Sequence, residues 1–447
     1  MPDAGKIDDL KRFYRACNPA RTLDYSDPED RRYYIDFTEV RSGNMIRELM
    51  RTITFSDDPT CQLFSGHIGC GKSTELLRLK AELEAGGYHV VYFVSSEDLD
   101  MGDVDITDIL FVITRKISDS LGAVGIRVQP GYFSKLFGEI KDLLQTEIDL
   151  SAGAELSVGL AKITAKTKQS ANTRNLLRDR LESRTGTIIT AINDEVIQPA
   201  VEKLKAAGKE GLVVIVDNLD RIHDVQKTTK HTQSEYIFFD RGEQLKALNC
   251  HLVYTIPLTL IFANDANVLA SRFGVRPKVL SMVPTRHRDG RSHDKGLQLL
   301  KEMVLARAFR DLDSEERLTS VDQVFQEPAM LDRLCEISGG HVRNLLGLMV
   351  GCLQKEDPPF PSAILEEVIR ESRDDMMRKI TSDEWELLQN VIEKQRVSGE
   401  AEHDVLLRGM FVFEYQDNRD GMWFDINPLL KGAKGIGPVR GPIEKTT

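Results

Sequence analysis

The stretch that decides the fold is Cys61-Gln62-Leu63-Phe64-Ser65, followed directly by Gly66-His67-Ile68-Gly69-Cys70-Gly71-Lys72-Ser73. The first five residues are predicted as a short strand, and the next eight begin with a glycine-rich turn. A helical pattern runs from Lys72 to Glu84, and Tyr88 to Val94 (YHVVYFV) is predicted as a second, largely buried strand. A strand, a helix and a strand of this length form a βαβ unit, which predicts a parallel sheet covered on both faces.

The turn matches the pattern G-x-x-x-x-G-K-[ST] in full. Its glycines allow backbone N–H groups to turn inward around a β-phosphate, and the helix that follows directs its positive end at the same group. We expect Lys72 to bridge the β- and γ-phosphates of ATP and the Ser73 hydroxyl to ligate Mg²⁺. A glycine-rich loop without a ligand is the alternative, which the flanking strand and helix disfavour. The predicted nucleotide-binding residues are Gly66, His67, Ile68, Gly69, Cys70, Gly71, Lys72, Ser73 and Thr74, with His67 and Cys70 as spacers.

Three further strands are predicted downstream, at Leu212 to Val216, His251 to Ile256 and Lys278 to Val283. Five strands with intervening helices indicate an α/β, doubly wound, parallel five-stranded P-loop NTPase core. Residues 122–207 lack strand signals and are predicted as a helical insertion. The predicted domains are an N-terminal segment (1–48), the core (49–295), a helical lid (296–379) and a winged-helix-like domain with its tail (380–447).

The strand Leu212 to Val216 ends in Asp217, which has the form of a Walker B carboxylate placed beside the Mg²⁺ site. Many P-loop ATPases carry Glu directly after this Asp to orient the attacking water, but Asn218 stands there in this chain. We favour Asp220 as the water-orienting base because it is the nearest carboxylate on that loop. In the alternative, Asp220 caps a turn and Asn218 marks a weak hydrolase.

On these motifs the chain resembles the AAA+ and STAND-type P-loop ATPases, including the NACHT and KAP subgroups and the origin-recognition-like ATPases. The resemblance covers about residues 49–350 and implies roles for three more residues. Thr255 in HLVYTIP resembles sensor 1, Arg272 in LASRFG matches the place of an arginine finger, and Arg343 in SGGHVR resembles sensor 2. In the alternatives, Arg272 caps a helix or pairs with a carboxylate, and Arg343 forms a structural ion pair. Val40-Arg41 also resembles the base-binding box of these ATPases.

A basic stripe runs from Lys162 to Arg184. The segment contains only two carboxylates, Asp179 and Glu182, against seven cations. The cations are Lys162, Lys166, Lys168, Arg174, Arg178, Arg180 and Arg184. Such a stripe is suited to a nucleic-acid backbone. The alternatives are a solvated helical face or a face that pairs with an acidic neighbouring protomer.

The C-terminal stretch from Thr381 to Asn427 shows the helix, helix, strand, strand order of a winged helix, and a T-x-x-E capping box opens it. Its balance is strongly negative, and the would-be recognition helix carries Glu400, Glu402 and Asp404, which phosphates would repel. We therefore interpret this domain as a protein-contact or autoinhibitory module. Its predicted core is Phe411, Phe413, Tyr415, Trp423 and Phe424.

Composition narrows the class of protein. The 447 residues, about three domains' worth of chain, carry a formal charge of −11, which argues against coating by nucleic acid through bulk charge. Six scattered cysteines include no C-x-x-C pair, and no His cluster has metal-ligand spacing, so neither a disulfide scaffold nor a zinc site is predicted. Without a signal peptide or an apolar run of membrane length, the sequence predicts a cytoplasmic protein with no membrane contact.

The leading prediction is an ATP-binding and slowly ATP-hydrolysing molecular switch of the AAA+/STAND type, with ATP and Mg²⁺ at its site. It is expected to form a homo-oligomer and to control a separate effector protein; the resemblance alone suggests bacterial signalling or anti-phage defence. One alternative is a DNA-associated ATPase of the loader or transposition-helper type that uses residues 162–184. Another is a nucleotide-binding scaffold without hydrolysis.

Overall fold

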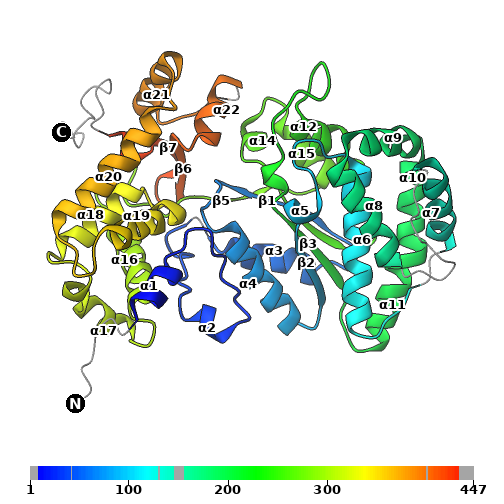
Figure 1. Cartoon of the computed structure of the whole chain (residues 1–447), viewed down its shortest axis with the longest axis horizontal. Coiled ribbons are helices and arrows are strands. Elements are labelled where there is room, and N and C mark those ends of the chain that lie inside the picture. The colour runs from blue at the N-terminus through cyan, green and yellow to red at the C-terminus, as the bar shows by residue number, and fades with distance from the viewer. Residues whose placement is uncertain (1–8, 42, 129–130, 145–155, 399–400, 432–447) are drawn as a thin grey trace. The chain divides into compact units, whose positions relative to one another are not determined.

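One five-stranded sheet, in the order β2-β3-β4-β1-β5, organises the computed structural model (Figure 1). Three neighbouring pairs, β2 with β3, β3 with β4 and β4 with β1, are parallel. All six residues of β3 are buried, as expected of a strand covered on both faces. The predicted α/β class and the five predicted strands are confirmed. The strands are β1 (Cys61–Gly66), β2 (His89–Val94), β3 (Leu212–Asp217), β4 (His251–Thr255) and β5 (Lys278–Leu280).

The structure describes residues 9–41, 43–128, 131–144, 156–398 and 401–431. Parts of the predicted N-terminal segment, insertion, recognition helix (including Glu400) and tail lie outside these ranges. The chain divides into two compact units. We call Met1–Met45, Gly66–Arg78 and Val279–Thr447 the terminal unit, and Ile46–Ser65 and Leu79–Lys278 the sheet unit.

The sheet unit has its own apolar core, built from strand residues and from the helix α6 (Ile106–Ala123), which packs on β2 and β3. Asp105 caps α6 in a capping box with Asp108. Helices α7 to α11 gather beside α6 (Figure 1), and the described part of residues 122–207 contains helices and no strand. The other helices of this unit are α5 (Ser95–Asp98), α7 (Gly131–Leu144), α8 (Leu156–Gln169), α9 (Ala171–Leu181), α10 (Thr185–Ile192), α11 (Gln198–Ala206), α12 (Gln233–Glu235), α13 (Gly242–Leu245), α14 (Thr259–Phe262) and α15 (Ala266–Phe273).

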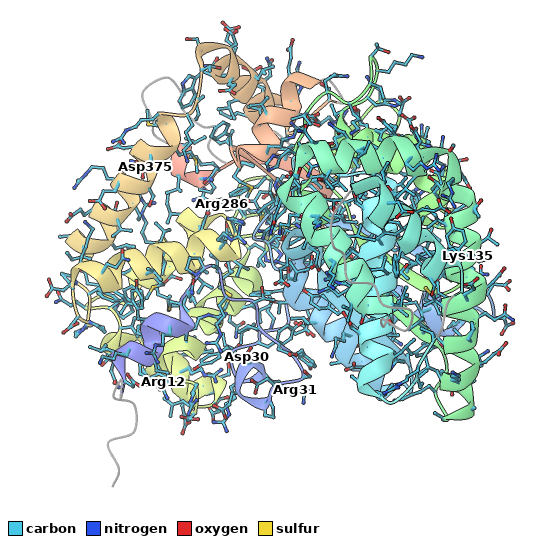
Figure 2. All side chains as sticks on the ribbon, turned by 45° about the vertical axis from the view of Figure 1, so that its right-hand side comes forward. Arg12, Asp30, Arg31, Lys135, Arg286 and Asp375 are labelled. Atoms are coloured by element: carbon cyan, nitrogen blue, oxygen red, sulfur yellow. The ribbon has the colours of Figure 1, made fainter. Side chains whose placement is uncertain are left out.

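The terminal unit has a second core, in which the predicted lid helices pack on one another and on the N-terminal segment. Arg12, labelled with Asp30 in Figure 2, donates to the Ala308 carbonyl at the end of α16. Arg307 donates to the Tyr33 carbonyl over 3.0 Å, so the N-terminal segment is fastened to this helix. The helices are α1 (Leu10–Ala16), α2 (Pro28–Arg31), α16 (Asp294–Ala308), α17 (Ser314–Thr319), α18 (Ala329–Ser338), α19 (Val342–Lys355), α20 (Ser362–Met377), α21 (Ser382–Lys394) and α22 (Ala401–Arg408), while α3 (Met45–Thr54) and α4 (Lys72–Ala85) cross the division between units.

After α21 and α22 the chain forms an antiparallel hairpin of β6 (Val412–Asp417) and β7 (Gly421–Ile426). The predicted order of helix, helix, strand and strand is therefore present, and the predicted Thr381–Glu384 capping box is confirmed. The five aromatic residues predicted as the core of this segment are all buried. The assignment to the winged-helix class stays a prediction. Across the described ranges, no helix combines the length and the apolar character needed to cross a membrane.

Candidate functional site: the glycine-rich loop and the Asp217 turn

The glycine-rich loop requires glycine at three positions. Gly66, Gly69 and Gly71 have φ angles of +149°, +90° and +109°, in the region that side chains disfavour. A Cβ atom at Gly69 would also lie 2.8 Å from the Cβ of Arg343 and 2.8 Å from Nε2 of His341. The loop conformation and the close approach of the lid therefore both depend on glycine.

Lys72 is the first residue of α4, and its side chain is buried. Its Nζ donates hydrogen bonds to the carbonyl oxygens of Gly66 (2.7 Å) and His67 (2.9 Å). A buried ammonium group needs such partners, and a phosphate oxygen is a stronger acceptor than either carbonyl. The lysine is thus held at the loop in a position suited to exchanging carbonyl oxygens for a phosphate.

The predicted lid segment contacts the loop directly, through the residues that precede and begin α19. Nε2 of His341 donates to the Ile68 carbonyl over 2.9 Å, and the backbone N–H of Arg343 donates to the Gly69 carbonyl over 3.2 Å. Burial lowers the pKa of His341 to about 4, so this histidine is neutral at pH 7. The structure brings Arg343 to the predicted loop, whereas sequence reasoning missed His341 in the same motif. The sensor role of Arg343 stays a prediction.

The C-terminal hairpin also contacts the loop. The backbone N–H of Glu414 in β6 donates to Nε2 of His67 over 2.9 Å. The Phe413 ring lies against His67 and His341, with centroids 5.8 and 5.5 Å away. Burial, with neighbouring His341 and Lys72, lowers the pKa of His67 far below its usual value, which matches its role as an acceptor. His67, predicted as a spacer rather than a catalytic residue, thus makes a structural contact that no local pattern could have revealed, because β6 is so distant in sequence.

The N-terminal segment supports the loop from another direction. Buried Arg41 donates from Nη2 to the Cys70 carbonyl over 2.9 Å. Tyr34 donates to Glu75 in the first turn of α4 (3.0 Å), and Arg78 donates to the Tyr34 hydroxyl (2.8 Å). Desolvation raises the pKa of the Glu75 carboxyl despite nearby arginines. Arg41, which the sequence placed in a base-binding box, contacts the loop backbone here.

Asp217 ends β3 in the sheet unit and is buried. Its Oδ2 accepts a hydrogen bond from the Tyr92 hydroxyl (2.8 Å), and its Oδ1 accepts from the Asn218 backbone N–H (2.7 Å). The Ser95 hydroxyl donates to the Asp217 carbonyl (2.7 Å). These bonds fix the carboxylate at the end of its strand, and carboxylate oxygens are ligands that Mg²⁺ prefers. Tyr92 and Ser95 were not singled out from sequence, because nothing in a buried strand marks a tyrosine as a carboxylate partner.

Thr255 shapes the turn that follows Asp217. Its hydroxyl accepts a hydrogen bond from the Leu219 backbone N–H (3.0 Å) and donates to the Val216 carbonyl (3.4 Å). The turn is a short 3₁₀ segment, Leu219–Arg221, in which the side chain of Asp220 is buried. The structure therefore places Asp217 and Asp220 at one turn of the sheet unit, and Thr255, at the end of β4, bonds to the backbone of that turn.

Arg272 lies in the last turn of α15, on a different element from the turn that follows Asp217. Its Nη1 donates to the Asp240 carbonyl over 3.5 Å, and its own carbonyl accepts from Lys246. The side chain is partly exposed. This geometry fits helix-end packing within one protomer, and the arginine-finger role stays a prediction.

The basic stripe is neutralised in part within the sheet unit. Arg174 pairs with Asp100 (3.0 Å) and Asp103 (2.9 Å), and its side chain is only 7% exposed. Arg178 pairs with Asp103 and Asp105, both at 2.9 Å. Counting charge along 162–184 alone missed these acids, which precede α6. Two of the seven cations therefore hold the insertion to the core, while Arg180 remains exposed.

No family model matches the chain, and no curated protein matches it. Among solved structures it is similar to the ORC1 protein of Aeropyrum pernix, in complex with DNA, at 12% identity and a TM-score of 0.36, covering 94% of this chain and 96% of that one. The Walker-type ATPase paby2304 of Pyrococcus abyssi gives 12% identity and 0.42, covering 92% and 97%. Cdc6p of Pyrobaculum aerophilum gives 13% and 0.33, covering 90% and 94%.

Proposed function

We propose that the chain is an ATP-binding and ATP-hydrolysing switch of the AAA+/STAND type. The observation that carries this proposal is the glycine-rich loop, whose three glycines have positive φ and whose Lys72 is held at the start of α4. Backbone N–H groups of such a loop and a helix N-terminus form a phosphate site. Ser73 of the terminal unit and Asp217 of the sheet unit each offer an oxygen ligand of the kind that Mg²⁺ accepts, and Mg²⁺ would supply positive charge beside the transferring phosphoryl group.

Residues of the terminal unit have defined tasks in this proposal. Lys72 would turn from the carbonyls of Gly66 and His67 toward the phosphates. Arg343, in the lid, would contact the γ-phosphate when it is present. The His67 ring accepts a hydrogen bond from the Glu414 backbone N–H in β6. A movement of the loop would therefore be transmitted to β6 through this one contact. Nucleotide state would thus bias the lid and hairpin, because the lid's γ-phosphate contact exists in only one state.

Residues of the sheet unit would perform the chemistry. Asp217 would hold Mg²⁺, and Asp220 would orient the attacking water. Thr255 holds the backbone between them, so its task would be positioning. Arg272 would complete the site of a neighbouring protomer. Control of a separate effector remains part of the proposal on the resemblance alone.

The decisive experiment is ATP turnover by the full chain with Lys72→Ala and, as a matched control on the same helix, Lys80→Ala. Lys80 pairs with Glu84 over 3.0 Å, far along α4 from the loop. We expect Lys72→Ala to abolish nucleotide binding and turnover, and Lys80→Ala to preserve both. Wild-type turnover no faster than that of Lys72→Ala would refute the ATPase. Nucleotide binding without turnover would support the scaffold.

Association with DNA is the second candidate. Part of the basic stripe, including Arg180, stays exposed, and exposed cations are suited to a nucleic-acid backbone. Substituting Arg174 or Arg178 would disturb folding, so Arg180→Ala is the informative variant. Duplex DNA binding that weakens with salt and falls in Arg180→Ala would favour this function. Equal DNA binding by wild type and Arg180→Ala would contradict a role of the basic stripe in DNA binding.

A further inference from the structure

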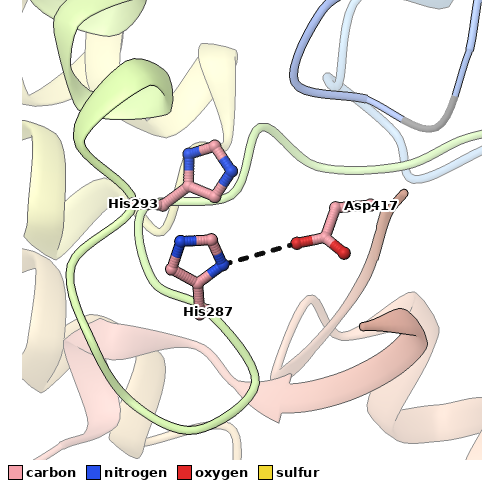
Figure 3. Close-up of side chains that lie close together, drawn as sticks. All are labelled: His287, His293 and Asp417. Carbon is pink, nitrogen blue, oxygen red and sulfur yellow. Dashed lines mark ion pairs between the residues drawn. The ribbon is translucent and has the colours of Figure 1, made fainter. Parts of the chain in front are cut away.

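Three side chains outside the nucleotide loop converge in the terminal unit: His287, His293 and Asp417 (Figure 3). Each offers one ligand atom, and these atoms all lie within 4.8 Å of one another. The two histidines belong to the loop between β5 and α16, and the aspartate ends β6. Two chain segments that are far apart in sequence therefore supply two nitrogen atoms and one oxygen atom as candidate ligands.

The loop is folded so that its two imidazole rings face each other. The backbone N–H of His293 donates to the Thr285 carbonyl (3.0 Å), and that of His287 donates to the Arg291 carbonyl (2.8 Å). The loop thereby closes like a small hairpin, and the ring centroids lie 4.5 Å apart. The backbone hydrogen bonds fix the loop, and a fixed loop keeps the two rings in place for a shared ligand.

Two of the ligand atoms are buried and make no hydrogen bond. Oδ2 of Asp417 and Nδ1 of His287 are both shielded from solvent and face each other at 3.6 Å, as the dashed line in Figure 3 shows. The Asp417 side chain is only 7% exposed, and its other oxygen accepts from the backbone N–H groups of Arg419 and Asp420. A separation of 3.6 Å is too long for a hydrogen bond. Two ligands about 2.1 Å from a tetrahedral Zn²⁺ lie roughly 3.4 Å apart, close to this gap.

The surroundings add negative charge. Oδ2 of Asp420 lies 3.5 Å from Nδ1 of His287 and also accepts from the Arg288 backbone N–H. Nδ1 of His293 accepts from the Gly296 N–H at the start of α16. A metal ion on Nε2 of His293 would place the ring proton on Nδ1, so binding exchanges this capping bond for a metal bond.

We propose that His287, His293 and Asp417 bind one Zn²⁺ ion, which fastens the loop leading into the lid to the end of β6. Two imidazoles and one carboxylate are a donor set that zinc accepts, with water in the fourth position. The ion would join α16 to the same hairpin whose Glu414 contacts His67, so it would stiffen the lid and hairpin together. Local spacing could not predict this site, because the third ligand lies far along the chain.

The test is a Zn²⁺ titration of the full chain, stripped with a chelator and measured in competition with a chromophoric chelator. His293→Asn is the most informative variant, because asparagine still caps α16 while removing the imidazole. His287→Ala and Asp417→Asn remove the other ligands. His231→Ala is the matched control, since His231 also faces two aspartates, Asp240 (2.9 Å) and Asp265 (3.8 Å).

We expect one equivalent of Zn²⁺ per wild-type chain and at least a tenfold weaker affinity in each ligand variant. The control should bind as wild type does, and Zn²⁺ should raise the melting temperature of wild type but not that of His293→Asn. Equal zinc affinity in wild type and His293→Asn would overturn the proposal, since the ion would then bind elsewhere. Zinc binding by wild type no tighter than by His287→Ala would overturn it as well.

Discussion

Replacing Glu414 with glutamine should make the protein more stable at neutral and alkaline pH. The Glu414 side chain lies in β6 with 1% residue exposure, and its Oε2 makes no hydrogen bond. Desolvation raises the pKa of this carboxyl from 4.5 to about 8. Glutamine preserves the shape of the protonated acid and never ionises, so the substitution isolates the cost of the charge.

The magnitude follows from proton linkage. The folded chain keeps the proton on Glu414 up to a pH near the raised pKa, whereas the unfolded chain releases it near 4.5. The contribution to stability is therefore fully present below pH 4.5 and falls by about 1.4 kcal/mol per pH unit until the folded pKa is passed. Relative to wild type, Glu414→Gln should gain less than about 1 kcal/mol at pH 5, about 3 kcal/mol at pH 7 and about 4 kcal/mol at pH 8.

Urea unfolding followed by tryptophan fluorescence is a suitable assay, because the chain's two tryptophans, Trp385 and Trp423, lie in α21 and β7 near the substituted strand. Exposed Glu402→Gln is the control, since it removes the same charge from the same C-terminal segment. A difference between Glu414→Gln and wild type that stays constant from pH 5 to pH 8 would refute the reasoning, whatever its size.

Three further substitutions test other contacts. Gly69→Ala should cost about 1–3 kcal/mol and weaken nucleotide binding, since its Cβ would meet Arg343 at 2.8 Å and φ is +90°; unchanged ATP affinity in a binding titration would contradict this. Tyr92→Phe removes the donor to Asp217 and should cost about 1.5–3 kcal/mol in urea unfolding, and an unaltered unfolding midpoint would argue against it. Asp103→Asn removes an acceptor shared by two arginines. Because those partners lower its pKa to about 2, the destabilisation should be present at pH 7 and fade as pH falls from about 4 to 2, which pH-dependent melting would check.

The sheet could be predicted from sequence because its signals are local. Continuous apolar runs such as LVVIV, which follows Gly211 and ends at Asp217, indicate buried parallel strands without any tertiary knowledge. The glycine-rich loop is equally local, since the backbone needs glycine at fixed offsets. The Thr381–Glu384 capping box is a third case, in which four residues define a helix start.

The contacts around the site could not be predicted, because they join distant segments. His67 accepts from a strand 347 residues away, and Arg178 pairs with aspartates about 70 residues before it. A charge count along one segment therefore indicated a free basic stripe where the fold has ion pairs. From the sequence, the only reason to expect Arg343 near the loop was the order of motifs along the chain.

The backbone of Asn218 has a consequence for how the proposed ATPase could evolve. Its φ of +65° is left-handed, a conformation that asparagine and aspartate tolerate far better than longer side chains. The backbone at this position, which carries glutamate in many P-loop ATPases, therefore disfavours glutamate sterically, although Gln395 and Met410 adopt similar φ angles of +51° and +60° elsewhere in the chain. Aspartate would add a second carboxylate here with less backbone strain than glutamate, in the turn that Thr255 holds.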